Sequence, residues 1–325
     1  MKRILVSGAS GIVGYGILRS LAQVEESCFL VGTSIYDDSV APAFCDHFEL
    51  APPTQDPKYL EWLLSTIRRN RIDMLIPGID VDMHFWLNHI SEIEATGALP
   101  LLNTPNLIML CADKWEFYQR IRQEEIGCLI ESSLKKDFNT LSERFDLPFL
   151  LKPRRGFGSK GIVRVASKEE FDDHKSRVGE FLMAQPIVGG DDEEYTTSAF
   201  CDGEGGYFAC MTMRRKLSTE GYTEKAEVSS NEQFLPAIKK LCQILNPLGP
   251  TNFQFRLCDD GPKLLEINPR ISSSTSIRTA FGYNESEMAL NFFLHRKTPV
   301  QPDIRQGRAV RFNDDKIFYE NGPHL

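Results

Sequence analysis

The chain has 325 residues, of which 42% are hydrophobic and 25% charged, the ordinary balance of a soluble globular protein. No apolar run is long enough to predict a membrane span, and the run that starts at Ile4 is too short for a signal peptide. The net charge of −8 argues against nucleic acid as a partner, and eight scattered cysteines without zinc-type spacing predict free thiols in a cytoplasmic protein.

A strand, a glycine turn and a helix open the chain. Residues 3–7 are apolar, Gly8 to Gly14 follow, and the pattern is then helical through Val24. This order is typical of an α/β domain with a doubly wound parallel sheet. The glycine spacing also resembles a dinucleotide fingerprint, in which the backbone approaches a phosphate. The same glycines allow tight packing in domains that bind no nucleotide, so both interpretations stay open.

Strand and helix repeats are predicted up to about residue 103. A helix over residues 57–70 precedes the apolar strand 74–77, and the loop after that strand contains Asp80 and Asp82. Ligands bind at the carboxyl ends of strands in open α/β sheets, so either aspartate is a candidate substrate contact. For Asp82, capping of the helix that follows is the stronger alternative.

Positive charge gathers in a glycine-rich loop of this acidic chain. Lys152 lies in the apolar strand 149–153, and the basic loop 154–161 joins it to the strand 162–165. A lysine in a buried strand needs a partner, and a glycine loop between antiparallel strands can fold over a triphosphate. A long hairpin with a basic tip is the alternative. Lys114 lies at the start of a predicted helix, where the dipole disfavours a cation. An anion partner is one interpretation of this position, and an ordinary surface lysine is the default alternative.

The stretch 263–278 brings oxygen donors and a guanidinium together. Its apolar residues Leu264 to Ile267 predict a strand, and alternation along a strand sends Glu266 and Asn268 to the same face. A carboxylate and an amide oxygen suit Mg²⁺, and the guanidinium of Arg270 can meet phosphate oxygens. The alternative is an edge strand with solvated polar residues.

Gln254 extends this group of oxygen donors. It lies in the predicted strand 249–257, and an Asp-Gly pair at 260–261 predicts a hairpin to the stretch that contains Glu266. The two strands are therefore expected to pair, and the side chains of Gln254 and Glu266 are expected to meet at one metal ion.

The chain resembles the ATP-grasp superfamily in the order of its motifs. This order is a lysine at a helix start, a strand lysine before a glycine loop, an acidic residue, and then Gln … Glu-x-Asn-x-Arg. The run Glu266 to Ser272, followed by Gly282 and Tyr283, is most similar to half of the carbamoyl phosphate synthetase large subunit. The resemblance implies a doubly wound parallel-sheet domain followed by a two-lobed ATP-grasp fold with antiparallel sheets. The implied parts are the α/β domain 1–103, the small lobe 104–185 with the glycine-rich loop, the large lobe 186–300 with the metal site, and a C-terminal strand tail 301–325.

The resemblance also implies roles for individual residues. Lys114 and Lys152 would contact the α- and β-phosphates of ATP, and Arg270 would steady the γ-phosphate and an acyl-phosphate. Arg214 would do similar work from the long strand 207–217. The residues implied in nucleotide binding are Gly156, Gly158, Ser159 and Gly161 in the loop, Gln185, Ile187 and Val188 in the adenine hinge, and Glu194 at the ribose. The implied ligands of Mg²⁺, with Mn²⁺ as a substitute, are Gln254, Glu266 and Asn268.

Two departures from the family pattern leave details open. Gln185 stands where many relatives have Glu, and the segment 189–193 is longer, so Glu193 competes with Glu194 for the ribose.

The implied activity is that of an ATP-dependent carboxylate–amine or carboxylate–thiol ligase, ADP-forming, with small-molecule substrates and a possible homodimer. With a single ATP-grasp unit, the chain is not expected to make carbamoyl phosphate itself. An NAD-dependent oxidoreductase and a non-catalytic ATP-binding protein are the alternatives.

Overall fold

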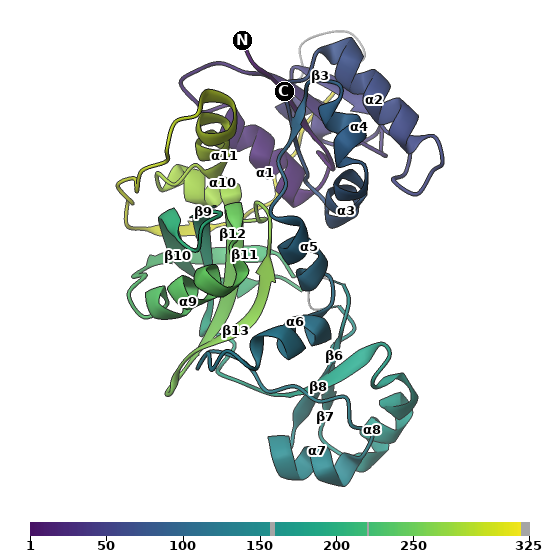
Figure 1. Ribbon diagram of the computed structural model, residues 1–325, viewed down its shortest axis with the longest axis vertical. Helices are drawn as coiled ribbons and strands as arrows, with labels where there is room; N and C mark the ends of the chain where they lie inside the picture. Colours follow the sequence, from purple (N-terminus) through teal and green to yellow (C-terminus); the bar gives the residue numbers. More distant parts are fainter. Residues whose placement is uncertain (157–159, 220, 320–325) are drawn as a thin grey trace.

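The computed structural model describes residues 1–156, 160–219 and 221–319. Three sheets divide these residues (Figure 1). The N-terminal part lies at one end of the molecule, a small three-stranded sheet at the other, and a long six-stranded sheet between them. Within the described ranges, no helix has the length and hydropathy needed to cross a bilayer.

The N-terminal sheet is parallel, in the order β3-β2-β1-β4-β5. Its strands are β1 (Arg3–Val6), β2 (Phe29–Ser34), β3 (His47–Leu50), β4 (Met74–Ile76) and β5 (Leu99–Pro100). The helices of this part are α1 (Ile12–Leu21), α2 (Tyr59–Asn70), α3 (Asp80–Asn88) and α4 (Ile90–Glu94), with a 3₁₀ turn, η1, over Ala41–Phe44. The central strand β1 is buried on both faces, as parallel sheets covered by helices require.

Gly14 allows a tight turn after β1, and Gly78 brings the carboxyl ends of β1 and β4 into contact. A Cβ atom on Gly14 would lie 2.3 Å from the carbonyl oxygen of Gly8, and one on Gly78 would lie 2.1 Å from that of Ser7. Only glycine fits at either position. The N-terminus of α1 and the loop before α3 therefore share one edge of the sheet, and this edge faces the rest of the chain.

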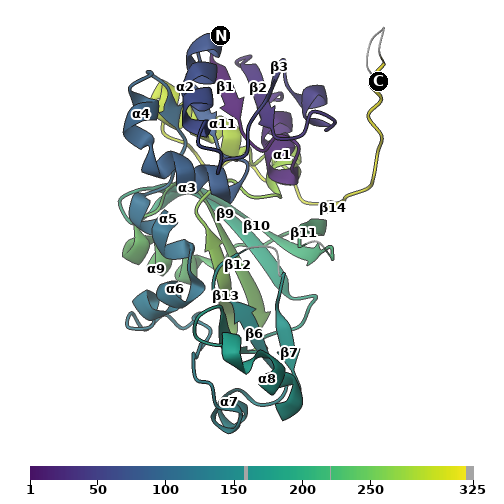
Figure 2. The same cartoon turned by 90° about the vertical axis from the view of Figure 1, so that its right-hand side faces the viewer.

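The small lobe contains an antiparallel sheet in the order β7-β6-β8. Its elements are α7 (Phe138–Phe145), β6 (Phe149–Pro153), β7 (Val163–Val165), α8 (Lys168–His174), a 3₁₀ turn, η2, over Lys175–Arg177, and β8 (Leu182–Pro186). Helices α5 (Pro105–Cys111) and α6 (Lys114–Ile121) connect it with the N-terminal part and run beside the long sheet, which Figure 2 shows from the side.

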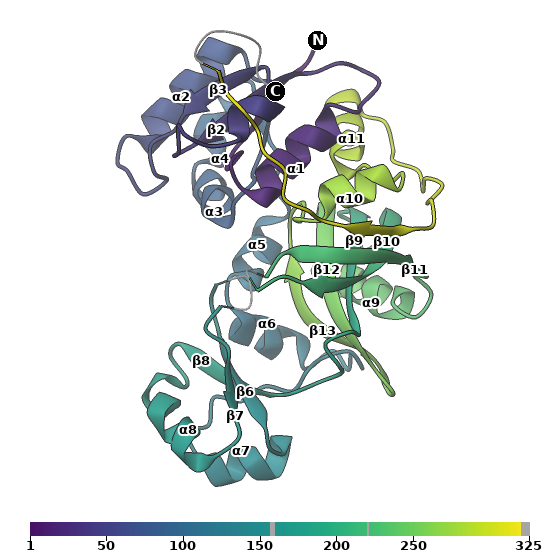
Figure 3. The same cartoon turned by 180° about the vertical axis from the view of Figure 1, so that it is seen from behind.

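The large lobe is built on an antiparallel sheet in the order β13-β12-β9-β10-β11-β14. The strands are β9 (Glu194–Asp202), β10 (Tyr207–Leu217), β11 (Thr223–Ser229), β12 (Leu248–Cys258), β13 (Gly261–Asn268) and β14 (Arg308–Val310). The helices are α9 (Leu235–Leu245), α10 (Thr275–Ala280) and α11 (Glu285–Ala289), which continues as a π turn, η3, over Leu290–Leu294. Figure 3 shows β14 beside β11, at the edge of the sheet.

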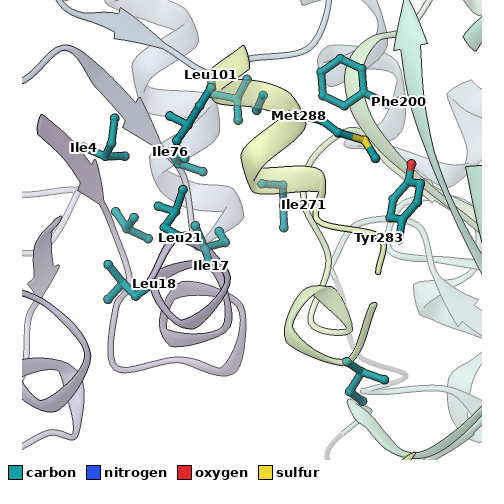
Figure 4. Packing of buried hydrophobic residues seen from close by; sticks show 14 of the residues in the cluster. Ile4, Ile17, Leu18, Leu21, Ile76, Leu101, Phe200, Ile271, Tyr283 and Met288 are labelled. Atoms are coloured by element: carbon teal, nitrogen blue, oxygen red, sulfur yellow. The ribbon is translucent and has the colours of Figure 1, made fainter. Parts of the chain in front are cut away.

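The N-terminal part and the large lobe share one hydrophobic core. Ile17 and Leu21 of α1 belong to the same buried cluster as Phe200 of β9 and Tyr283 (Figure 4). The small lobe instead has a cluster of its own around Phe149. A parallel sheet followed by antiparallel sheets confirms the predicted fold class, whereas the domain boundaries stay a prediction.

Candidate functional site

One face of the long sheet carries most of the predicted site. Gln254 of β12 lies opposite Glu266 of β13, and Arg256 lies opposite Glu194 of β9. Asn252 lies opposite Asn268 in the same ladder. Residues that are directly opposite on neighbouring strands point to the same side of a sheet. The register therefore brings predicted metal and ribose residues from three strands to one surface.

A cavity of about 570 Å³ opens over this face, between the long sheet, the small lobe and the edge of the N-terminal sheet. The predicted site residues that line it are Lys114, Lys152, Gly156, Gln185, Val188, Glu194, Gln254, Glu266, Asn268 and Arg270. Ile187 is 37% exposed and does not line it. Gly161 has a left-handed φ of 74° and lies beside Pro153. Gly158 and Ser159 lie outside the described residues.

Two lysines and Glu266 form a charged cluster in the cavity. Nζ of Lys114 lies 3.8 Å from Oε2 of Glu266 and donates to the carbonyl of Gly156 at 2.7 Å. Nζ of Lys152 donates to the carbonyl of Leu265 at 3.2 Å. Burial would raise the pKa of Glu266, but the two lysines outweigh it and lower the pKa. Burial also lowers the pKa of Lys152 to about 8, so its charge needs an anionic partner.

The predicted metal residues offer one carboxylate and amide oxygens. Nδ2 of Asn268 donates to Glu266 at 3.2 Å, and Oε1 of Gln254 accepts from Arg215 at 2.7 Å. The described ranges contain no group of three or more His, Cys, Asp or Glu placed to hold a metal ion. One carboxylate with amide oxygens suits Mg²⁺ when phosphate oxygens supply further ligands. This donor set fits a magnesium–nucleotide complex.

Arg215, which the sequence did not single out, holds Glu194 in the cavity wall. Its Nε and Nη2 donate to Oε1 of Glu194 at 3.1 and 2.8 Å, and both side chains are almost fully buried. Glu193 points elsewhere, because its carboxylate accepts from the hydroxyl of Tyr195 at 3.0 Å. Of the two neighbouring glutamates, Glu194 is therefore the one that faces the cavity.

The prediction for Arg214 is wrong. Its side chain lies on the opposite face of β10, where it pairs with Glu227 at 3.0 Å and is 47% exposed. Side chains alternate along a strand, so the neighbouring residues Arg214 and Arg215 point to opposite faces of the sheet. Met211 and Met213 lie on the same face of β10 as Arg215 and belong to the buried core. These two hydrophobic residues are the sequence signal that Arg215, and not Arg214, points inward.

Asp80 and Arg270 join the N-terminal part to the large lobe at the cavity. Nη2 of Arg270 donates to Oδ2 of Asp80 at 3.0 Å, and Nε donates to the other carboxylate oxygen. Burial would raise the pKa of Asp80, but the guanidinium outweighs it and lowers the pKa. Asp82 does not cap α3, because it lies inside the helix and accepts from Thr54 and Tyr59 at 2.6 and 2.8 Å.

The strand β8 and the segment after it border the cavity near the predicted adenine hinge. Nε2 of Gln185 donates to the hydroxyl of Ser132 at 2.8 Å, which fixes the amide group of a buried side chain. The carbonyl of Val188 accepts from Arg256 at 3.4 Å.

Comparison with known proteins shows similarity to an ATP-grasp family and to part of the carbamoyl phosphate synthase large chain. A family model described as "ATP-grasp in the biosynthetic pathway with Ter operon" matches residues 182–315. The carbamoyl phosphate synthase large chain of Methanosarcina mazei is 22% identical over 324 residues, which cover 87% of this chain and 29% of that one. The corresponding protein of Archaeoglobus fulgidus is 25% identical over 65% of this chain and 21% of its own length. The chain thus spans well under half the length of these relatives.

Solved structures share the fold. N5-carboxyaminoimidazole synthetase from Staphylococcus aureus superposes with a TM-score of 0.73 at 13% identity, over 93% of this chain and 80% of that one. The biotin carboxylase domain of Hydrogenobacter thermophilus 2-oxoglutarate carboxylase, solved with MgADP and bicarbonate, gives 0.71 at 16% identity, over 94% of this chain and 73% of that one. The chain is thus similar to ATP-grasp proteins over residues 182–315 and shares the fold of these solved structures.

Proposed function

We propose that the protein is an ATP-dependent, ADP-forming ligase that activates a small carboxylate as an acyl-phosphate and transfers the acyl group to an amine. The observation that carries the proposal is the cluster of Lys114, Lys152 and Glu266 inside the cavity between the lobes. Two ammonium groups beside one carboxylate suit a bound polyphosphate. Among proteins of similar fold, a carboxyaminoimidazole ribonucleotide synthase has been solved with ATP.

The nucleotide is proposed to lie along the inner face of the long sheet. Lys114 and Lys152 contact the phosphates, Glu194 accepts hydrogen bonds from the ribose, and the segment from Gln185 to Val188 contacts adenine. Glu266, Asn268 and Gln254 would hold Mg²⁺, which would supply charge neutralisation for the phosphates. Both Gln254 and Glu194 already interact with Arg215, so this arginine orients a metal ligand and the ribose acid together.

The carboxylate substrate is proposed to bind beside Arg270, where the hydroxyls of Ser272 and Ser273 also line the cavity. A carboxylate oxygen attacks the γ-phosphorus, the bond from this phosphorus to the β-phosphate oxygen breaks, and ADP leaves. The amine then attacks the acyl carbon, and the C–O bond to phosphate breaks. Arg270 stabilises negative charge on the transferred phosphoryl group, and enclosure by the small lobe excludes water from the acyl-phosphate. No side-chain nucleophile is required.

Trapping of the acyl-phosphate tests this proposal. Purified protein is incubated with Mg-ATP, hydroxylamine and pools of amino acids, hydroxy acids and sugar acids. We expect carboxylate-dependent release of ADP together with a hydroxamate from at least one pool. Glu266→Gln, which keeps the shape of the side chain but removes its charge, should abolish both products at an unchanged melting temperature. Full activity in this variant would contradict the metal assignment, and ATP binding without ADP release from any pool would favour a non-catalytic protein.

The oxidoreductase alternative has little support from the structure. Packing explains Gly8 and Gly14, because a Cβ atom on Gly14 would lie 2.3 Å from the carbonyl oxygen of Gly8 in the same turn, and one on Gly8 would lie 2.7 Å from the side chain of Ile79 in the β4–α3 turn. The turn therefore needs glycine for packing, without any dinucleotide. A homodimer and a cytoplasmic location remain predictions.

A further inference from the structure

A second cavity adjoins the first, and most of its lining has no role in the proposed nucleotide chemistry. Its volume is about 260 Å³, and it lies between α3, α5 and α6 on one side and β8 and β13 on the other. Among the residues that line both cavities are Asp80, Lys114, Gln185, Glu266 and Asn268, so the two spaces meet at the charged cluster.

The lining of the second cavity is mainly apolar. The side chains that give it this character are Met83, Ile108, Phe117, Ile130, Met183 and Leu264. An apolar cavity of about 150 Å³ is enough to bind benzene. The space beside β13 is larger, so it accommodates a phenyl or branched alkyl group with a short chain. Apolar ligand groups are favoured there because their burial removes hydrocarbon surface from water.

Asp80 stands where the two cavities meet. Within the described residues, its carboxylate accepts two hydrogen bonds, both from Arg270. An ionised carboxylate offers about four acceptor positions, so it can also accept from an ammonium group. Its side chain is 23% exposed, which leaves it accessible from the cavities. An ammonium on Asp80 would lie next to Arg270, where the acyl-phosphate is proposed to form.

We propose that the second cavity binds the apolar part of the amine substrate and that Asp80 binds its ammonium group. The inference rests on the proposed ligase function and specifies the nucleophile as a primary amine with an aromatic or branched aliphatic substituent. The ammonium loses one proton to water, and the resulting neutral amine attacks the acyl carbon. The amide C–N bond forms, the C–O bond to phosphate breaks, and the second amine proton leaves with the phosphate or to water. Asp80 binds and orients the amine, since a carboxylate paired with a guanidinium is a weak base.

Calorimetry with matched probes tests the proposal. Protein saturated with Mg²⁺ and a non-hydrolysable ATP analogue is titrated with 2-phenylethylamine, with its uncharged analogue 2-phenylethanol, and with ethanolamine, which keeps the amine but lacks the ring. We expect 2-phenylethylamine to bind at least about tenfold more tightly than either control. In Asp80→Asn the advantage of the amine over the alcohol should disappear. Equal binding of all three probes to the wild-type protein would overturn the proposal.

Two variants of the cavity wall locate the binding site. Ala112→Leu adds side-chain volume to the second cavity and should weaken 2-phenylethylamine about tenfold, with unchanged affinity for the ATP analogue. Cys111→Ala enlarges the same cavity and should shift preference toward the longer 4-phenylbutylamine, which gives a second reading if Ala112→Leu folds poorly. Unchanged amine affinity in a folded Ala112→Leu variant, or no shift in Cys111→Ala, would refute this location.

The two proposals fail in different ways. Hydroxamate formation without selective amine binding would leave the ligase function intact and reject the amine site. Selective amine binding without ADP release from any carboxylate pool would retain the site and reject the ligase chemistry.

Discussion

Arg214 and Arg215 provide an internal pair for testing the geometry of the site. Arg215→Met removes a cation that pairs with Glu194 at 2.8 Å, where the two side chains are 4% and 8% exposed. Among the described residues, the buried carboxylate then keeps one ion pair, with Arg256 at 3.6 Å. Breaking a buried ion pair on one side costs about 3–5 kcal/mol, and the remaining arginine places the expected loss near the lower limit, about 3 kcal/mol.

Arg214→Met is the matched control. Its partner Glu227 is 58% exposed, and solvent screens such a pair, so the expected loss is about 0–1 kcal/mol. Urea unfolding followed by circular dichroism measures both variants, and calorimetry measures their affinity for the ATP analogue. Affinity should fall about tenfold only in Arg215→Met, because Gln254 and Glu194 lose the group that orients them. Equal losses in the two variants, in stability or in affinity, would refute the assignment of faces.

Three further outcomes are expected. Burial lowers the pKa of Lys152 to about 8. The affinity for ATP should therefore fall as the pH rises through this value, because a neutral amine no longer attracts phosphate. A calorimetric pH series measures this inflection, and Lys152→Arg should remove it. Gly14→Ala should lower the melting temperature, since the new Cβ would lie 2.3 Å from the oxygen of Gly8, and NAD should stabilise neither protein. Glu285→Ala leaves the fully buried Arg278 without its carboxylate partner and should cost about 3–5 kcal/mol in urea unfolding; a loss below about 1 kcal/mol would show that the buried charge is compensated elsewhere.

Local patterns were sufficient to predict the pair of strands that carries the candidate metal residues. The two-residue period places Glu266 and Asn268 on one face, and the Asp-Gly turn pairs their strand with that of Gln254, which the register of β12 and β13 shows. Because both signals act over short stretches of chain, no knowledge of the rest of the fold is needed. The glycine turn at the start likewise predicts the first strand and helix of the parallel sheet.

Such local patterns do not predict contacts between distant segments of the chain. The choice between Arg214 and Arg215 depends on how β10 pairs with β9, and periodicity within one strand does not provide that register. Asp82 has the sequence position of a helix cap, but it lies inside the helix, where it accepts a hydrogen bond from the distant residue Tyr59. The pair of Asp80 and Arg270 joins residues 190 positions apart, so the second cavity beside it exists only in the folded chain.

The charge of the cavity explains how an acidic protein can bind an anionic nucleotide. The chain has a net charge of −8, yet cations outnumber carboxylates among the groups that line the larger cavity. The cations are Lys114, Lys152, Lys160, Arg215, Arg256 and Arg270, and the carboxylates are Asp80, Glu194 and Glu266. Lys114, Arg215 and Arg270 each lie within 4 Å of one of these carboxylates, so the excess positive charge belongs to Lys152, Lys160 and Arg256. The proposed magnesium–nucleotide complex would supply the missing negative charge, whereas the net negative charge of the chain disfavours longer polyanions such as nucleic acid, because their charge would extend beyond the cavity.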